Sequence, residues 1–258
     1  MLATDDDVIG MREAGGTAAR LLNYLGKHVK PGISTGELDR LAAGWTSSAG
    51  AYSAPFGYRN GNRTPFPAHI CTSVNEVVCH GIPSDAAILK DGDIVNIDVT
   101  PVLNGYHGDT SRTFTVGRCG PEAVKLIGVA EECLMEGIRF AVEGEFLGSI
   151  GAAIERHAIS KGYSIIREFT GHGIGRRFHA QPYVTHYGIP RTGIRLRSGM
   201  IFTIEPILCK GDPSISFRND WEAVLNSGRL TAQAEHTVLV GKDVAEILTN
   251  ESSTANNN

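Results

Sequence analysis

The clearest structural signal in the sequence is the stretch GDIVNIDVTPVLNGYHGDTSRTFTV, residues 92–116. It contains two β-rich runs, Asp93–Val102 and Tyr106–Val116, on either side of Asn104-Gly105. An Asn-Gly pair between two such runs is the strongest short-range signal for a β-hairpin, because both residues readily adopt the positive φ of a tight turn. The sequence therefore predicts an antiparallel strand pair here.

The register of this hairpin places two acids on one face. A two-residue turn at that place sets Asp98 opposite Ser111 and Asp109 opposite Thr100. Since residues two apart share a face, the acids become diagonal neighbours about 7–8 Å apart at the backbone, close enough to share one ion. On a buried strand pair such acids repel each other and need a cation, whereas on a solvated outer face they are incidental. Both interpretations remain open at this point.

A second stretch resembles the first strand of the hairpin. Gly92–Asp98 and Gly199–Glu205 each read as a strand that ends in a carboxylate. Seven residues are a short match, so chance is the competing explanation. If the similarity is real, the fold consists of two related halves that meet at a shared site.

Helical and strand patterns surround the hairpin. Apolar residues at helical spacing predict a helix over about 8–29, and Ser34–Glu37 fits a capping box that opens a second helix. Pro121 lies in the first turn of a third predicted helix that ends near residue 140, and Ser149 is predicted to cap a fourth that ends near residue 162. Further strands are predicted at Met200–Leu208, Trp221–Leu225 and His236–Val240.

Composition argues against several classes of protein. The chain has 258 residues, of which 41% are hydrophobic and 20% charged, as in an ordinary soluble globular protein. Its net charge of −4 argues against binding DNA through a broad basic surface, and no run approaches the ~18 apolar residues of a membrane span. Five cysteines without a Cys-x-x-Cys pair indicate reduced thiols in a reducing, cytoplasmic compartment.

Further acids and histidines are ambiguous when taken singly. Glu205 ends an apolar run and needs a partner when buried, but a structural ion pair would serve as well as a metal. Glu235 alone reads as a surface acid at the edge of a strand. His80, His172 and His179 lie near glycines, which suits a site loop, although a lone histidine is more often structural.

The combination is more specific than its parts. A pattern that resembles the type I methionine aminopeptidases is formed by His80, Asp98, Asp109, His172, His179, Glu205 and Glu235. The resemblance covers nearly the whole chain up to Val240. Its most specific stretches are Ser73–Gly81, Asn104–Phe114, Gly171–His179 and Phe202–Pro206.

The resemblance implies an α+β fold, the pita-bread or creatinase/aminopeptidase-like fold, with two pseudo-symmetric halves, antiparallel sheet and helices on the outer face. It implies a single catalytic metallo-aminopeptidase domain over residues 1–250, and the small polar residues over 251–258 predict a disordered tail. The implied activity is co-translational removal of the N-terminal methionine from nascent proteins and peptides whose second residue is small. The implied enzyme is a cytoplasmic monomer that meets nascent chains near the ribosome and binds neither DNA nor membranes.

By resemblance, five residues form a dinuclear metal centre. Asp109 and Glu235 would bridge two divalent ions, Asp98 would hold one ion, and His172 with Glu205 would hold the other. Four carboxylates and one imidazole suit Co, Mn, Fe or Zn, and their four negative charges match two divalent cations. Two bridged ions about 3.5–4 Å apart can bind the attacking water and polarise the scissile carbonyl.

The resemblance also implies roles for residues around the metals. Glu205 would be the general base, His179 the oxyanion donor, and His80 a contact for the substrate backbone or the departing amine. A monovalent cation is implied near Asn75 and Val77. An apolar pocket for the methionine side chain is implied at Phe66, Cys71, Phe178 and Trp221, with His80 and His179 beside it.

One loop departs from the family pattern. Between Tyr58 and Phe66 the chain carries Arg59–Pro65, which is longer than the usual segment and leaves the alignment of Tyr58 and the shape of the pocket rim open. Two rival functions remain. A proline-specific peptidase of the same fold usually carries an N-terminal domain, for which Asp98 comes too early in the chain. A metal-free binding module of this fold should have lost ligands.

Overall fold

A computed structural model of the chain describes residues 2–251. Four helices come from two parts of the chain, α1 (Asp5–Gly26) with α2 (Thr35–Ser48), and α3 (Pro121–Ile138) with α4 (Leu147–Ser160). The strands of the first half are β1 (Tyr52–Ser53), β2 (Cys71–Val74), β3 (Val77–Cys79), β4 (Ile94–Val99), β5 (Pro101–Leu103), β6 (Tyr106–His107) and β7 (Thr110–Thr115). Those of the second half are β8 (Ser164–Ile165), β9 (Gly171–Gly173), β10 (Ala180–Val184), β11 (Ile201–Ile204), β12 (Ile207–Cys209), β13 (Ile215–Phe217), β14 (Ala223–Leu225), β15 (Thr231–Gln233), β16 (His236–Leu239) and β17 (Glu246–Ile247).

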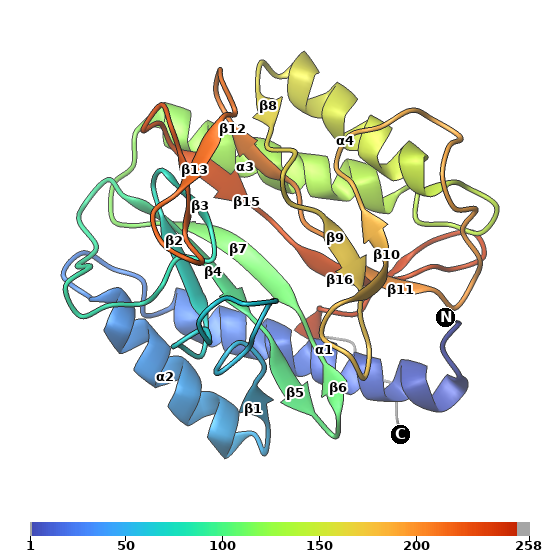
Figure 1. Cartoon of the computed structure of the whole chain (residues 1–258), viewed down its shortest axis with the longest axis horizontal. Coiled ribbons are helices and arrows are strands. Elements are labelled where there is room, and N and C mark those ends of the chain that lie inside the picture. The colour runs from blue at the N-terminus through green and yellow to red at the C-terminus, as the bar shows by residue number, and fades with distance from the viewer. Residues whose placement is uncertain (1, 252–258) are drawn as a thin grey trace.

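The two helix pairs flank a set of antiparallel sheets. Helices α1 and α2 lie along one side of the molecule and α3 and α4 along the opposite side, with the strands between them (Figure 1). The predicted α+β class is therefore confirmed. The predicted polar tail lies, apart from its first residue, outside the described residues.

The predicted hairpin forms with the predicted register. Asp98 pairs with Ser111 across β4 and β7, and the ladder continues through β5 and β6 to the turn. At the turn Asn104 and Gly105 have φ values of 52° and 82°, which Asn and Gly tolerate best. Because β4 also pairs with β2, Asp98 lies on the central strand of a three-stranded sheet.

The second half repeats this arrangement. The Gly92 N–H donates to the Val116 carbonyl over 2.9 Å at the start of β4, and the Gly199 N–H donates to the Val240 carbonyl over 3.0 Å just before β11. Both glycines have a φ near +90°, a conformation that favours glycine. The two similar stretches therefore begin equivalent strands, each paired antiparallel with a later strand, β7 or β16.

The two halves join where β7 meets the β15–β16 segment, and in Figure 1 these strands lie side by side through the centre. The Glu235 N–H donates to the Ser111 carbonyl over 3.0 Å. The Thr237 hydroxyl donates to the Asp109 carbonyl over 2.8 Å. These bonds bring an acid from each half to one place.

The helix ends agree with the sequence in part. Ser34 caps α2 by accepting a hydrogen bond from the Glu37 N–H, which is one of the two bonds of the predicted capping box. Helix α1 begins at Asp5, earlier than predicted, because Thr4 and Asp7 form a reciprocal capping box. The prediction that Ser149 caps α4 is wrong, because the cap position is Phe146. Ser149 lies inside the helix, and its hydroxyl accepts from the N–H of Arg191 in a later loop.

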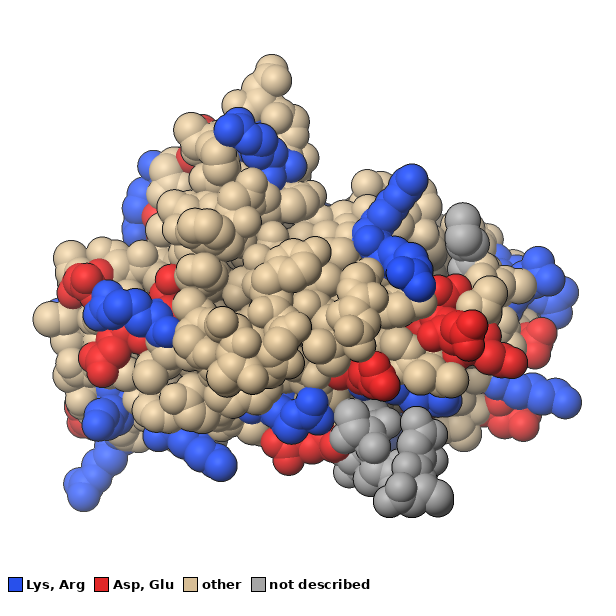
Figure 2. All heavy atoms as spheres, turned by 90° about the horizontal axis from the view of Figure 1, so that it is seen from below, with Lys and Arg blue, Asp and Glu red and all other residues tan. Residues whose placement is uncertain are grey.

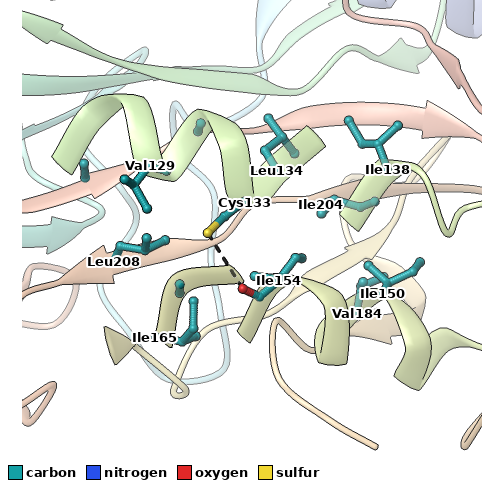
Figure 3. Packing of buried hydrophobic residues seen from close by; sticks show 14 of the residues in the cluster. Val129, Cys133, Leu134, Ile138, Ile150, Ile154, Ile165, Val184, Ile204 and Leu208 are labelled. Carbon is teal, nitrogen blue, oxygen red and sulfur yellow. Dashed lines mark hydrogen bonds between the residues drawn. The ribbon is translucent and has the colours of Figure 1, made fainter. Parts of the chain in front are cut away.

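The largest apolar cluster fills the space between α3, α4 and the second half of the strands (Figure 3). Cys133 of α3 faces Ile154 of α4, and its thiol donates to the Ile154 carbonyl over 3.7 Å. Gly137 lies directly against the Ile154 side chain, so the helices approach closely where no Cβ intervenes. Truncating a fully buried isoleucine such as Ile154 to alanine costs about 2–5 kcal/mol, so this packing supports the strands that carry the site.

The surface charges and the state of the cysteines agree with what the composition predicted. On the described part of the face shown in Figure 2, Lys and Arg side chains are interspersed with Asp and Glu rather than gathered into a basic field. Within residues 2–251 no helix combines the length and apolar character that crossing a membrane requires. All five cysteines are free thiols, as predicted.

Candidate metal centre and substrate pocket

One cavity of about 300 Å³ collects every catalytic, metal-binding and substrate-binding residue predicted from the sequence. It lies where the two halves meet, and its walls come from strands and loops of both. The predicted residues that line it are Phe66, Cys71, His80, Asp98, Asp109, His172, Phe178, His179, Glu205, Trp221 and Glu235.

Three buried side chains form the centre of this cavity. Asp109, His172 and Glu235 each offer a ligand atom, and these atoms all lie within 4.8 Å of one another. The residues are only 3%, 6% and 3% exposed. Asp109 and Glu235, the two residues predicted to bridge a pair of ions, therefore lie together with the predicted histidine.

The other two predicted ligands border this centre. Glu205 follows β11, and its Oε1 lies 3.8 Å from Nε2 of His172, while Oδ2 of Asp109 lies 3.5 Å from the same nitrogen. Asp98 lies on β4 beside Cys71 of β2 and also faces the cavity. The predicted strand at 200–208 is interrupted after Ile204, so Glu205 occupies a break between β11 and β12.

Neighbouring hydroxyls and an amide orient the carboxylates. Thr100 Oγ1 donates to Oδ1 of Asp109 over 2.8 Å, which is the cross-strand pair expected from the hairpin. Thr203 Oγ1 donates to Oε1 of Glu205 over 2.8 Å, and Nε2 of Gln233 lies 3.3 Å from Oε2 of the same carboxylate. Neither Thr203 nor Gln233 was predicted as a site residue. For Thr203 a local signal was available, since it shares a strand face with Glu205.

The backbone around His172 is held by close strand packing. A Cβ on Gly171 would meet the Thr203 carbonyl, and one on Gly173 would meet the Gln181 carbonyl, so both positions require glycine. The His172 N–H donates to Thr203 Oγ1 over 2.9 Å. Nδ1 of His172 lies 3.2 Å from the Gly173 carbonyl, and donating there leaves Nε2 as the ligand atom toward the acids.

The charges of the site fit bound cations. Burial, and then repulsion by Asp109 and Glu205, raises the pKa of Asp98 well above its usual value. The pKa of Glu235 is raised well above its usual value by the same causes in the same order, with Asp98 adding to the repulsion. Burial lowers the pKa of His172, but the hydrogen bond that its ring donates to Asp109 and the charges of Glu205 and Asp109 outweigh it and raise the pKa overall. Divalent cations among these carboxylates would remove this repulsion, so the donor set fits a metal centre.

Two further histidines border the centre. Nδ1 of His179 lies 2.8 Å from the Tyr58 hydroxyl, and its ring packs against His172 with centroids 4.3 Å apart. Loss of solvent and the neighbouring His172 lower the pKa of His179 to about 4. Burial and then the charge of Arg63 lower the pKa of His80 to about 4. Both rings are therefore neutral near pH 7, each with a single N–H to donate.

Most residues of the predicted apolar pocket pack against one another. Phe66, Cys71 and Trp221 belong to one buried cluster, with the Phe66 and Trp221 rings 5.5 Å apart at nearly a right angle. Phe178 packs on His179 with ring centroids 4.0 Å apart and faces the cavity from the other side. Cys79 also lines the cavity, and the sequence analysis missed it because a buried cysteine carries no distinguishing signal.

The region predicted to bind a monovalent cation brings two carbonyls together. The carbonyl oxygens of Asn75 and Val77 lie 3.1 and 3.0 Å from the Thr231 hydroxyl. Asn75 has a φ of 54°, and its carbonyl also accepts from the Thr231 N–H over 2.9 Å. Carbonyl oxygens so gathered are suitable ligands, and the cation itself stays a prediction.

Comparison with known proteins agrees with the geometry. The pattern of metallopeptidase family M24 matches residues 9–242. The chain is 51% identical over 240 residues to methionine aminopeptidase A of Synechocystis sp., covering 93% of each protein. Among solved structures, methionine aminopeptidase from Rickettsia prowazekii matches with a TM-score of 0.93 at 44% identity, over 97% of this chain and 99% of that chain.

A more distant likeness confirms the pita-bread fold. Xaa-Pro dipeptidase from Bacillus anthracis matches with a TM-score of 0.77 at 22% identity, over 96% of this chain and 62% of that chain. At that identity the likeness concerns the fold alone. The higher identities and the M24 pattern decide the family, and the resemblance inferred from the sequence is confirmed. The chain belongs to the methionine aminopeptidases of metallopeptidase family M24.

Proposed function

We propose that this hydrolase removes the N-terminal methionine from peptides and nascent proteins whose second residue is small. The observation that carries the proposal is the adjacency of two features in one cavity, the Asp109–His172–Glu235 centre and an apolar pocket walled by Phe66 and Trp221. The first feature supplies hydrolytic chemistry, and the second selects an uncharged side chain of suitable length.

Two divalent ions fit the site best, with Asp109 and Glu235 shared between them. Asp98 would complete one ion's ligands, and His172 with Glu205 those of the other. Once bound, such ions lower the pKa of a water molecule, polarise the scissile carbonyl and take up a free α-amine. Four carboxylates balance the charge of two divalent ions, which supports this number of ions over one.

The remaining chemistry belongs to the protein. Glu205 accepts the proton of the attacking water on a carboxylate oxygen and returns it to the nitrogen of the departing peptide. With Nδ1 of His179 accepting from the Tyr58 hydroxyl, the ring carries its proton on Nε2 and can donate to the carbonyl oxygen as negative charge develops there. His80 holds the substrate backbone next to the bond that is cleaved.

The apolar pocket sets the specificity for the first residue. Phe66, Cys71 and Trp221 are at most 7% exposed and offer aromatic and sulfur surfaces, which suit the polarisable thioether of methionine. A charged side chain placed there would lose its hydration without gaining a partner.

The cellular setting is proposed on the same basis. We place the enzyme in the cytoplasm as a monomer, with residues 1–250 as one catalytic unit that acts on nascent chains near the ribosome. Free cysteines support a reducing compartment. The mixed charges on the described part of the face in Figure 2 support an enzyme that does not depend on DNA or anionic membranes.

Metal analysis combined with peptide hydrolysis tests the proposal. The purified enzyme is assayed for methionine release from Met-Ala-Ser, stripped with a chelator, and supplied in turn with Co, Mn, Fe or Zn. We expect loss of activity on chelation and recovery at about two equivalents of metal. Full activity without metal, or no methionine release with any of the four, would refute the proposal.

A further inference from the structure

The segment Arg59–Pro65 is largely exposed, but Asn60 and Arg63 line the cavity. At its base, Gly57 and Tyr58 pair with Phe66 through backbone hydrogen bonds of 2.8 and 2.9 Å. At its far end, Thr64 is attached to the chain beyond β13. Its N–H and hydroxyl donate to one Asp220 oxygen over 3.0 and 2.9 Å.

The pocket wall itself fixes the loop. Nε1 of Trp221 donates to the Thr64 carbonyl over 2.9 Å, so the ring that lines the methionine pocket also holds the loop. The neighbouring residue, Arg63, consequently lines the cavity. Its guanidinium lies 5.4 Å from the Trp221 ring and 5.5 Å from the Phe217 ring, within the range of cation–π attraction.

The guanidinium of Arg63 lies within ion-pair distance of no acid in residues 2–251. Among the described residues it forms neither an ion pair nor a side-chain hydrogen bond, although other arginines of the chain, such as Arg12 and Arg218, do. Asp220 is close enough for Arg63 to help lower its pKa, but its hydrogen bonds to Thr64 contribute first. Cation–π attraction to the two rings uses none of the guanidinium N–H groups, which therefore remain available to an acceptor.

The charge of Arg63 reaches His80, the residue proposed to hold the substrate backbone. His80, placed above next to the scissile bond, lies on the Trp221 ring with centroids 6.4 Å apart. After burial, Arg63 is the next cause of the lowered pKa of His80. Arg63 is thus separated from the cleavage point by about one aromatic ring, a distance that the third or fourth residue of a peptide can span.

We propose that Arg63 binds a carboxylate of the substrate downstream of the scissile bond. The carboxylate is either the free C-terminus of a short peptide or an Asp or Glu side chain at the third or fourth residue. This inference rests on the proposed function and adds to it a subsite for residues beyond the second. Because the pair would be partly solvated, its contribution is modest and falls as salt rises.

Four peptides separate the two sources of the carboxylate. Met-Ala-Ser is compared with its C-terminal amide, and Met-Ala-Asp-amide with Met-Ala-Asn-amide. For each pair, kcat/KM is measured for the wild type, Arg63→Gln, and Arg59→Gln. Arg59 is the matched control, since it lies in the same loop, is exposed and does not line the cavity. Thermal unfolding checks that each variant is folded.

We expect the wild type to favour the acidic member of at least one pair by about three- to five-fold, mainly through KM. Arg63→Gln should bring that ratio to about one, and Arg59→Gln should leave it unchanged. Arg63→Lys should keep part of it, since the charge remains and the planar stacking does not. Equal ratios in the wild type and Arg63→Gln for both pairs would overturn the inference while methionine release from the amides continues. If methionine were released from none of the four peptides, the proposed function would be refuted instead.

Discussion

The backbone N–H of Glu205 donates a hydrogen bond over 3.0 Å to Nε2 of His186, a residue 19 positions earlier in the chain. His186 is 1% exposed, and burial lowers its pKa to about 3, so its ring stays neutral at every pH well above 3. With Nε2 accepting, the ring proton is on Nδ1, which has no partner among the described residues. His186 thus supports the chain at the break after β11, where Glu205 turns into the cavity.

Replacing His186 should therefore affect the metal centre. In His186→Ala the Glu205 N–H is left buried without an acceptor. The backbone that positions the Glu205 carboxylate is then no longer held in place. We expect metal affinity and kcat/KM to fall about 10–100-fold, as for other residues that orient a metal ligand. Isothermal titration calorimetry with the metal measures the change in metal affinity. The control is His157→Ala, since His157 of α4 forms its side-chain hydrogen bond with the surface residue Glu132 of α3. Lower thermal stability with unchanged metal affinity would contradict the role of His186.

Local patterns predicted the parts of the site that one segment determines. The Asn104-Gly105 turn fixes the register of β4 with β7, so the positions of Asp98 and Asp109 follow from chain geometry alone. Chain geometry could not place Glu205 beside His172, because no local rule sets the approach of β9 to β11. Those assignments came from resemblance to a family.

The errors have equally physical causes. Ser149 has the chemistry of a helix cap, but tertiary contacts with the loop at Arg191 use its hydroxyl. His186 carries no sequence signal, since its acceptor role depends on a strand break 19 residues away. The position of Arg63 depends on Trp221 and Asp220, which lie more than 150 residues further along the chain.

Removing the charge of Asp109 should empty the metal centre. In Asp109→Asn the Thr100 hydroxyl can still donate to Oδ1, so the hairpin should fold. The other oxygen, 3.5 Å from Nε2 of His172, is replaced by an N–H donor that cannot bind a cation. We expect methionine release to fall by more than about a hundredfold and metal content to drop with it. Asp85→Asn, at an exposed acid paired with Arg40, is the control. Full activity of Asp109→Asn would refute the dinuclear assignment.

Two substitutions distinguish oxyanion stabilisation from metal binding. His179→Ala should lower kcat by about a hundredfold or more while metal content stays near that of the wild type. Tyr58→Phe removes the hydroxyl 2.8 Å from Nδ1 of His179 and leaves the ring free to adopt either tautomer. A smaller loss of kcat with little change in KM is expected there, because only one tautomer donates from Nε2. Metal analysis of both variants is the check, and substantial metal loss in His179→Ala would mean that this histidine is a ligand.

The substrate range follows from the two sides of the cavity. In the proposed mechanism the metal centre would fix the amine on one side, and on the other side Phe178 and His80, which line the cavity, would restrict the space after the scissile bond. Met-Ala, Met-Gly and Met-Ser peptides should therefore be cleaved, whereas Met-Leu, Met-Lys and Met-Phe peptides should be poor substrates, mainly through kcat/KM. At the first position norleucine should be accepted, since it matches methionine in length and carries no charge. Lysine should be rejected, because its ammonium would be buried against Phe66 and Trp221 without a partner. A competition assay on such a set measures all the ratios together. Faster release of leucine or lysine than of methionine would leave the hydrolytic chemistry in place and refute the proposed substrate.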